Sequence, residues 1–75
     1  MASNINIGSE IREELKRQGR TVTWLSHQLG VSRMACYRIF HGYSIDTQML
    51  HSISVLLGVD FFKFYSDAIG ENETE

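Results

Sequence analysis

Helix-capping side chains and glycines alternate along this chain of 75 residues, and the alternation restricts it to short helical segments. Side chains that can accept hydrogen bonds from the first amides of a helix stand at Asn6, Thr21, Ser32, Asp46 and Asp60. The segments that the first four begin run to Gly19, Gly30, Gly42 and Gly58. Because glycine readily adopts the backbone conformation that ends a helix, each segment is predicted to be a separate helix.

The apolar residues within these segments recur every three or four positions, which indicates the faces that turn toward a core. They are Ile7, Ile11 and Leu15 in the first segment, Leu25 and Leu29 in the second, Leu50, Ile53 and Leu57 in the fourth, and Phe61, Phe64 and Ala68 in the fifth. No segment alternates with a period of two for long enough to form a strand. We therefore expect an all-α fold, a compact bundle of about five short helices.

A chain of this length forms one domain at most, and its 43% of apolar residues suffices for one core. We expect the folded domain over residues 6–70, a disordered N-terminus over residues 1–5 and a disordered acidic tail over residues 71–75. The first residues contain no export signal and no apolar run that would span a membrane. The single cysteine, Cys36, cannot form an intramolecular disulfide, so we expect a cytoplasmic protein.

The residues that could carry chemistry do not form a catalytic or metal-binding pattern. His27, His41 and His51 lack a spacing that would converge with Cys36 on a metal ion. Serine, histidine and aspartate are scattered over short helices without the strand-turn-helix elbow of a hydrolase. We expect no enzyme activity, cofactor, metal or small-molecule substrate.

The charged residues are unevenly distributed along the chain. The net charge is −2, which by itself argues against an anionic partner, but three of the acids lie together near the C-terminus. The stretch from Leu15 to Ile45 contains no acidic residue and five basic ones, which are Lys16, Arg17, Arg20, Arg33 and Arg38. A basic middle in an acidic chain is compatible with a nucleic-acid partner.

The segment 33–40 has two distinct faces when successive residues are placed 100° apart around a helix. One face carries Ala35, Cys36, Ile39 and Phe40. The other face carries Arg33, Tyr37, His41, Met34 and Arg38. A helix face with two arginines and no acid suits a polyanion, because arginine donates two parallel hydrogen bonds to guanine in the major groove of DNA. The alternative is a charged face that only contacts solvent.

The stretch from Arg20 to Gly58 resembles the phage-repressor type of helix-turn-helix, called the XRE or Cro/C1 family. The residues that carry the resemblance are Thr21, Leu25, Ser26, Leu29, the turn Gly30-Val31-Ser32, Cys36, Ile39, Gly42, Leu50, Ile53 and the ending Leu57-Gly58-Val59. The resemblance implies a lambda-repressor-like helix-turn-helix domain whose recognition helix, 33–40, lies in the major groove of double-stranded DNA. It also implies a transcriptional regulator, with a repressor as the first expectation.

The resemblance assigns roles to individual residues. Base reading falls to Arg33, Met34, Tyr37 and Arg38. Phosphate contact falls to Arg20, Thr21, Thr23, Ser32, His41 and Tyr43. The chain departs from the family at Val22, where a glutamine commonly grips a phosphate, and the neighbouring threonine hydroxyls would replace that contact. Instead of contacting bases, Met34 and Tyr37 could fold back against Trp24.

The aromatic run near the C-terminus is apolar on almost every side. One short helix cannot bury that much apolar surface within its own monomer. The residues expected in a dimer contact are Phe61, Phe62, Phe64 and Tyr65. A two-fold homodimer would present two recognition helices about 34 Å apart, one turn of DNA. The alternative is a last helix that packs within its own monomer.

A second function, of a different class, also fits the sequence. The fold could serve as a helix-turn-helix protein-interaction module, or an antitoxin-type adapter, that binds a protein partner through the aromatic C-terminal helix or Trp24. The overall acidity and Val22 favour this alternative. The salt dependence of binding to random duplex DNA separates the two functions.

Overall fold

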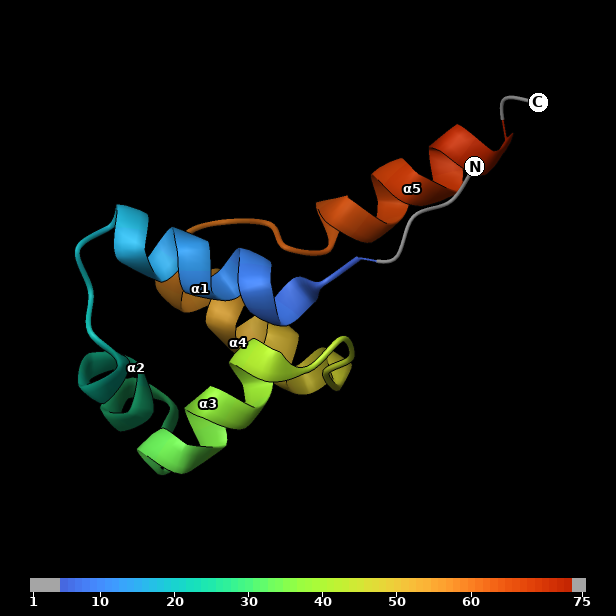
Figure 1. Ribbon diagram of the computed structural model, residues 1–75. Helices are drawn as coiled ribbons and strands as arrows, with labels where there is room; N and C mark the ends of the chain where they lie inside the picture. The colour runs from blue at the N-terminus through green and yellow to red at the C-terminus, as the bar shows by residue number, and fades with distance from the viewer. Residues whose placement is uncertain (1–4, 74–75) are drawn as a thin grey trace.

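Residues 5–73 are described by a computed structural model, in which each of the five expected segments forms a helix (Figure 1). The helices are α1 (Ile7–Arg17), α2 (Val22–Leu29), α3 (Arg33–His41), α4 (Thr47–Leu57) and α5 (Lys63–Glu73). The part of the chain that the structure describes contains no strand. The prediction of an all-α fold with five short helices is confirmed.

Four of the predicted caps make the expected hydrogen bond, in which a side-chain oxygen accepts from the backbone N–H three residues later. The pairs are Asn6 Oδ1 with Ser9 at 3.2 Å, Thr21 Oγ1 with Trp24 at 3.0 Å, Ser32 Oγ with Ala35 at 3.1 Å and Asp46 Oδ1 with Met49 at 2.7 Å. These bonds satisfy amides that a helix leaves free at its start. They set where the first four helices begin.

Three residues join α2 to α3, and the first of them must be glycine. Gly30 has a φ of 70°, in the left-handed region that other residues avoid. Its N–H donates to the carbonyl of His27 at 3.3 Å, and the N–H of Val31 donates to the carbonyl of Ser26 at 3.0 Å. Both bonds satisfy carbonyls at the end of α2, and Ser32 then caps α3 directly. The short connection holds α3 against α2.

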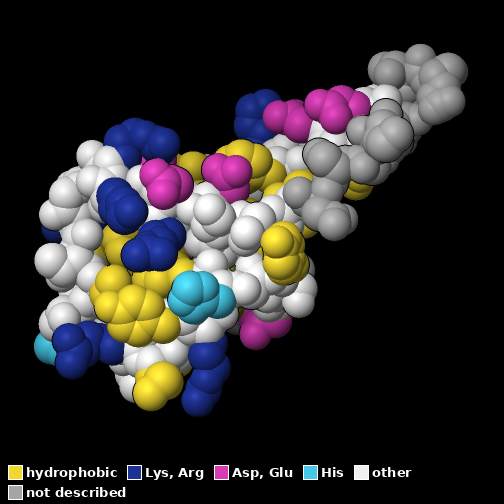
Figure 2. All heavy atoms as spheres, viewed as in Figure 1, with side chains coloured by type: hydrophobic (Ala, Val, Ile, Leu, Met, Phe, Trp, Pro, Cys, Tyr) yellow, Lys and Arg dark blue, Asp and Glu magenta, His cyan; other side chains and the backbone are white. Residues whose placement is uncertain are grey.

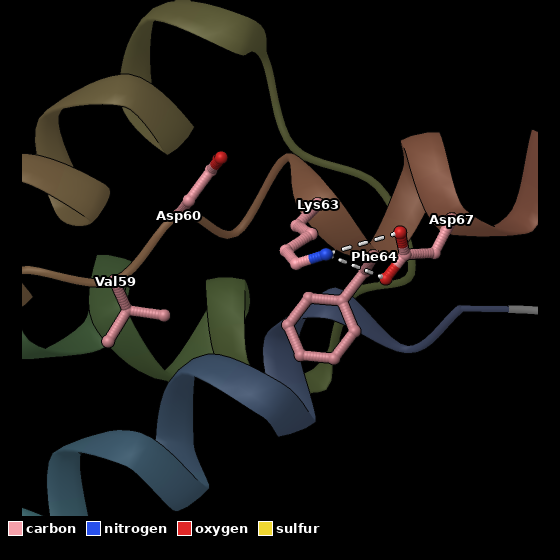
Figure 3. Close-up of a pocket in the computed structure, with 5 residues that line it drawn as sticks. All are labelled: Val59, Asp60, Lys63, Phe64 and Asp67. Carbon is pink, nitrogen blue, oxygen red and sulfur yellow. Dashed lines mark hydrogen bonds and ion pairs between the residues drawn. The ribbon is translucent and has the colours of Figure 1, made fainter.

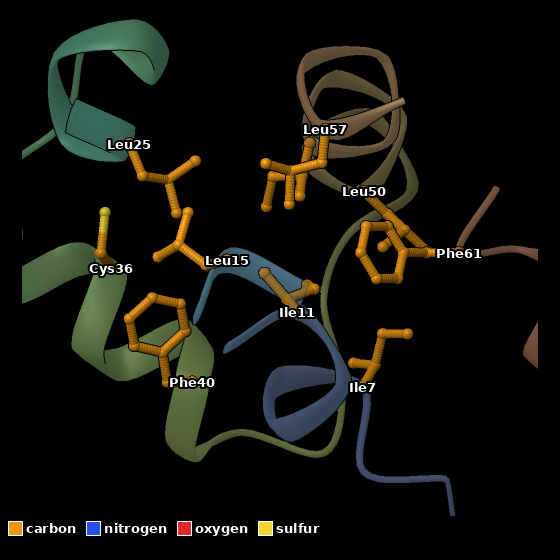
Figure 4. Close-up of a cluster of buried hydrophobic side chains, with 10 residues drawn as sticks. Ile7, Ile11, Leu15, Leu25, Cys36, Phe40, Leu50, Leu57 and Phe61 are labelled. Atoms are coloured by element: carbon orange, nitrogen blue, oxygen red, sulfur yellow. The ribbon is translucent and has the colours of Figure 1, made fainter. Parts of the chain in front are cut away.

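Ten buried side chains form one core between the first four helices (Figure 4). They are Ile7, Ile11, Leu15, Leu25, Cys36, Phe40, Leu50, Ile53, Leu57 and Phe61. All the inward positions expected in α1 and α4 are among them. On the inner face of α3, Ala35 and Ile39 are half-buried beside Cys36 and Phe40. The helical spacing of apolar residues therefore identified the buried faces of these helices.

The packing of α1 on α3 depends on a glycine inside a helix. Gly8 is buried in the first turn of α1. A Cβ atom built on Gly8 would lie 2.6 Å from the carbonyl oxygen of Phe40 and closer still to that of Ile39. Only a residue without a side chain allows two backbones to approach this closely. Gly8 thereby sets the position of α3 on the body of the protein.

The last helix begins and ends later than the sequence predicts. Asp60 accepts a hydrogen bond from the N–H of Phe62, two residues later, at 3.1 Å, which closes a turn instead of capping a helix. Phe61 in this turn is 1% exposed, and burial of its ring in the core keeps the chain off the helical path until Lys63. The expected acidic tail is helical from residue 71 as far as Glu73. Residues 1–4 and 74–75 lie outside the described residues.

α5 extends away from the body that the other four helices form (Figure 1). As a result the protein measures 43 × 21 × 21 Å along its principal axes. Phe62 and Tyr65 are half-buried against the core, whereas Ile69, further along α5, is 58% exposed. An isolated helix of 11 residues is marginal in water. The stability of α5 therefore depends on the contacts that Phe62 and Tyr65 make with the core.

Candidate nucleic-acid interface

The outer face of α3 is free because the inner face holds the helix on the core. Cys36 is 0% exposed and Phe40 is 4% exposed, and α3 packs on both α1 and α2. The four residues expected to read bases are all exposed, namely Arg33, Met34, Tyr37 and Arg38. The predicted division of α3 into a buried face and a free face is confirmed.

The two arginines on this face have no carboxylate partner among residues 5–73. The ion pairs among residues 5–73 join Lys16 to Glu13, Arg17 to Glu14, and Lys63 to Asp67. Neither Arg33 nor Arg38 takes part in any of them. Both side chains are exposed, so their guanidinium groups are available to an anionic ligand.

The position of Arg33 is not explained by the stability of α3. Arg33 is the first residue of the helix, where the aligned peptide dipoles place positive charge. A cation at that end is unfavourable by about 0.3–1 kcal/mol, and acids are preferred there. The first turns of α2 and α3 contain no acid. Arg38 and His41 lie in the last turn of α3, where a cation is favourable.

The six residues expected at phosphates are also exposed, and they are Arg20, Thr21, Thr23, Ser32, His41 and Tyr43. The hydroxyl oxygens of Thr21 and Ser32 accept hydrogen bonds as helix caps. A hydroxyl has one hydrogen of its own, so each cap can still donate to a phosphate oxygen. The starts of α2 and α3 therefore offer donors without losing their caps.

Figure 2 shows one face of the protein, on which basic and acidic side chains lie beside one another over α1. Lys and Arg side chains lie over α1 and around α2 and α3, whereas no acidic side chain is visible over α3. The acidic side chains on this face lie mainly over the upper edge of α1 and over α5. On this face, most of the acidic side chains therefore lie away from α3.

Tyr37 and Met34 are both exposed on the outer face of α3. The Tyr37 ring meets Phe40 edge to face, with ring centroids 5.9 Å apart and an interplanar angle of 88°. Met34 is 64% exposed. The indole of Trp24 is instead covered by Arg20, whose Cζ atom lies 4.3 Å from the ring centroid.

Gln18 and Trp24 make contacts that the sequence interpretation did not predict. The Nε2 atom of Gln18 donates to the carbonyl of Leu57 at 2.8 Å and to Glu14 at 2.8 Å, which ties the end of α1 to the end of α4. Trp24 supports Arg20 across a spacing of four residues. Arg20 lies before the start of α2, so helical spacing does not predict its contact with Trp24, and no local pattern indicates the Gln18 bond.

The thiol of Cys36 belongs to the core and not to the interface. It is 0% exposed, and burial raises its pKa above the ordinary value of 9.0. The thiol therefore stays protonated at neutral pH and packs as a small apolar group, in agreement with its predicted position on the inner face of α3.

The aromatic residues near the C-terminus divide between core and surface. Phe61 is 1% exposed and has no surface to offer a second copy, so it cannot supply the dimer contact expected of it. Phe62 and Tyr65 are half-buried. The prediction that Phe64 faces the core was wrong, since its side chain is 37% exposed and stacks on the outside of Phe61 with ring centroids 6.3 Å apart.

Phe64 also lines a pocket of about 250 Å³ beside the Lys63–Asp67 ion pair (Figure 3). The other lining residues are Val59 and Asp60. Lys63 and Asp67 bond to each other across one turn of α5, with Nζ 3.4 Å from Oδ1. Two of the charged side chains that line this pocket, Lys63 and Asp67, therefore already form an ion pair with each other.

Within residues 5–73, no three His, Cys, Asp or Glu side chains come together as metal ligands would, and no helix is long and apolar enough to cross a bilayer. No protein-family model, curated protein or solved structure matches this chain. A function therefore has to be inferred from the exposed residues of α2 and α3 and from the charges that they carry.

Proposed function

We propose that this protein binds double-stranded DNA with α2 and α3 as a helix-turn-helix, as a transcriptional regulator of the XRE or Cro/C1 type. The observation that carries the proposal is the exposed outer face of α3, which holds two arginines without carboxylate partners. The buried thiol of Cys36 is compatible with a reducing cytoplasm as its location. The protein acts by occupying an operator, which makes it a repressor where the operator overlaps a promoter.

In this proposal α3 enters the major groove, which is wide enough for one helix. Arg33 and Arg38 donate to acceptors on guanine edges, and Met34 and Tyr37 contact a thymine methyl group or a sugar. The phosphate contacts come from Arg20 and the exposed hydroxyl and imidazole groups named above. Base contacts give specificity, whereas phosphate contacts fix the register of the protein on the duplex.

The salt dependence of binding to a duplex of random sequence tests this proposal. We expect measurable affinity at low salt, with the logarithm of the binding constant falling linearly as the logarithm of the salt concentration rises, because bound cations on DNA are released. Fluorescence anisotropy of a labelled duplex measures it. Sequencing of duplexes selected from a random pool would then give the operator. Absence of binding at low salt would favour the alternative, a protein-interaction module that uses α5.

The exposed side of α5 supports a homodimer as the DNA-binding form. Tyr65 and Ile69 are four residues apart and therefore lie on one side of α5, and Ile69 is 58% exposed; an apolar side of a protruding helix is suited to a two-fold contact. Ile69→Glu should shift the protein toward monomer in sedimentation equilibrium. Val55→Glu is the matched control, since Val55 is 67% exposed on α4. An identical association constant for the wild type and Ile69→Glu would exclude this contact.

A further inference from the structure

The connection between α1 and α2 fixes the backbone of Arg20 beside the first turn of α2. Gly19 has a φ of 70°, and the N–H of Arg20 donates to the carbonyl of Leu15 at 3.0 Å. Thr21 follows at once as the cap of α2. The Cα atom of Arg20 is therefore held between two helices, and only its side chain is left to move.

The Arg20 side chain lies on the indole of Trp24. Its Cζ atom is 4.3 Å from the ring centroid, inside the distance of about 6 Å over which a cation is attracted to an aromatic face. Trp24 is half-buried and packs against the core, so the ring is a fixed platform. Stacking covers one face of the planar guanidinium group and leaves the N–H groups along its edge free to donate.

The two cations nearest before Arg20 in the chain, Lys16 and Arg17, are held in a different way. Arg17 pairs with Glu14, and Lys16 Nζ lies 4.0 Å from a carboxylate oxygen of Glu13. Among the residues that the structure describes, Arg20 has no ion pair of this kind. A carboxylate orients a cation but also cancels its charge, whereas an indole orients it and leaves the charge intact. Only the second arrangement keeps the attraction for a phosphate.

We propose that Trp24 is a positioning residue that holds Arg20 ready to bind a phosphate of the DNA backbone. The proposal rests on the DNA-binding function proposed above, and it assigns to Trp24 a role beyond packing. A side chain that is already ordered loses less conformational freedom when it binds, so the stacked arginine binds more tightly than a free one.

Binding to a random-sequence duplex, measured by anisotropy over a range of salt concentrations, tests this role. Arg20→Ala should weaken binding and reduce the salt slope by about 1. Trp24→Leu should weaken binding by about 2- to 5-fold, the equivalent of an exposed cation–π contact, and Trp24→Phe should recover most of that loss. The double variant should bind no more weakly than Arg20→Ala alone. Additive losses, or no effect of Trp24→Leu, would overturn the proposal.

Because Trp24→Leu also removes core packing, a second measurement uses the native indole. Trp24 is the single tryptophan of the chain, so fluorescence emission reports on it alone. We expect Arg20→Ala to change the emission of the free protein, and DNA to change wild-type emission with the same midpoint as the anisotropy. Identical emission from the wild type and Arg20→Ala would show that the stack does not form. If Trp24→Leu leaves duplex binding unchanged, the positioning role fails and the DNA-binding function stands; if the wild type binds no duplex, both fail.

Discussion

Replacing Gly8 with alanine is expected to lower the free energy of unfolding by about 2 kcal/mol, as the balance of two opposing effects. The new methyl group would meet the carbonyl oxygens of Ile39 and Phe40, which belong to the backbone of α3 and yield only if α3 moves. The clash therefore lies near the upper end of the ~1–3 kcal/mol that overpacking costs. The better helix propensity of alanine offsets about 1 kcal/mol of it.

Thermal unfolding followed by circular dichroism measures this change, and the midpoint should fall by roughly 8–16 °C in a domain of this size. Gly70→Ala is the matched control, because Gly70 lies inside α5 and a Cβ there has no heavy atom within 4 Å. That variant should gain up to about 1 kcal/mol. A midpoint for Gly8→Ala equal to that of the wild type would contradict the close approach of α1 and α3.

Replacing Arg33 with alanine is expected to weaken binding to the selected operator by about 1–3 kcal/mol, or roughly 5- to 150-fold. The same variant should be as stable as the wild type or slightly more stable. A cation in the first turn of a helix is unfavourable by about 0.3–1 kcal/mol, and alanine is a better helix former than arginine. Loss of binding without loss of stability would separate a contact residue from a structural one.

Two further variants test whether the loss of binding depends on where the positive charge lies. Arg38→Ala should also weaken operator binding, but it removes a favourable cation from the last turn of α3 and so should lower stability slightly. Lys63→Ala removes one positive charge from α5, where the lysine pairs with Asp67, and should leave operator affinity nearly unchanged. Titrations of one labelled operator compare all four proteins. An affinity of Arg33→Ala equal to that of the wild type rules out its role in base reading.

The elements were predictable because the signals that start and end these helices are local. Thr21, Ser32 and Asp46 each bond an amide three residues away, so their effect depends on no distant part of the chain. The prediction was wrong at Asp60, where the same kind of side chain closes a turn. There the burial of Phe61 in a core made by other helices decided the local conformation.

The order of caps, apolar positions and glycines was enough to determine five helices, the inner faces of the first four and the exposed, acid-free face of α3, since each depends on residues within a few positions of one another. Tertiary structure decided what depends on residues far apart in the chain. Gly8 matters only because α3 passes over it, and Phe61 joins the core only because α1 and α4 leave room for its ring. Helix period and capping act over one turn, whereas close packing depends on every element that meets at one place.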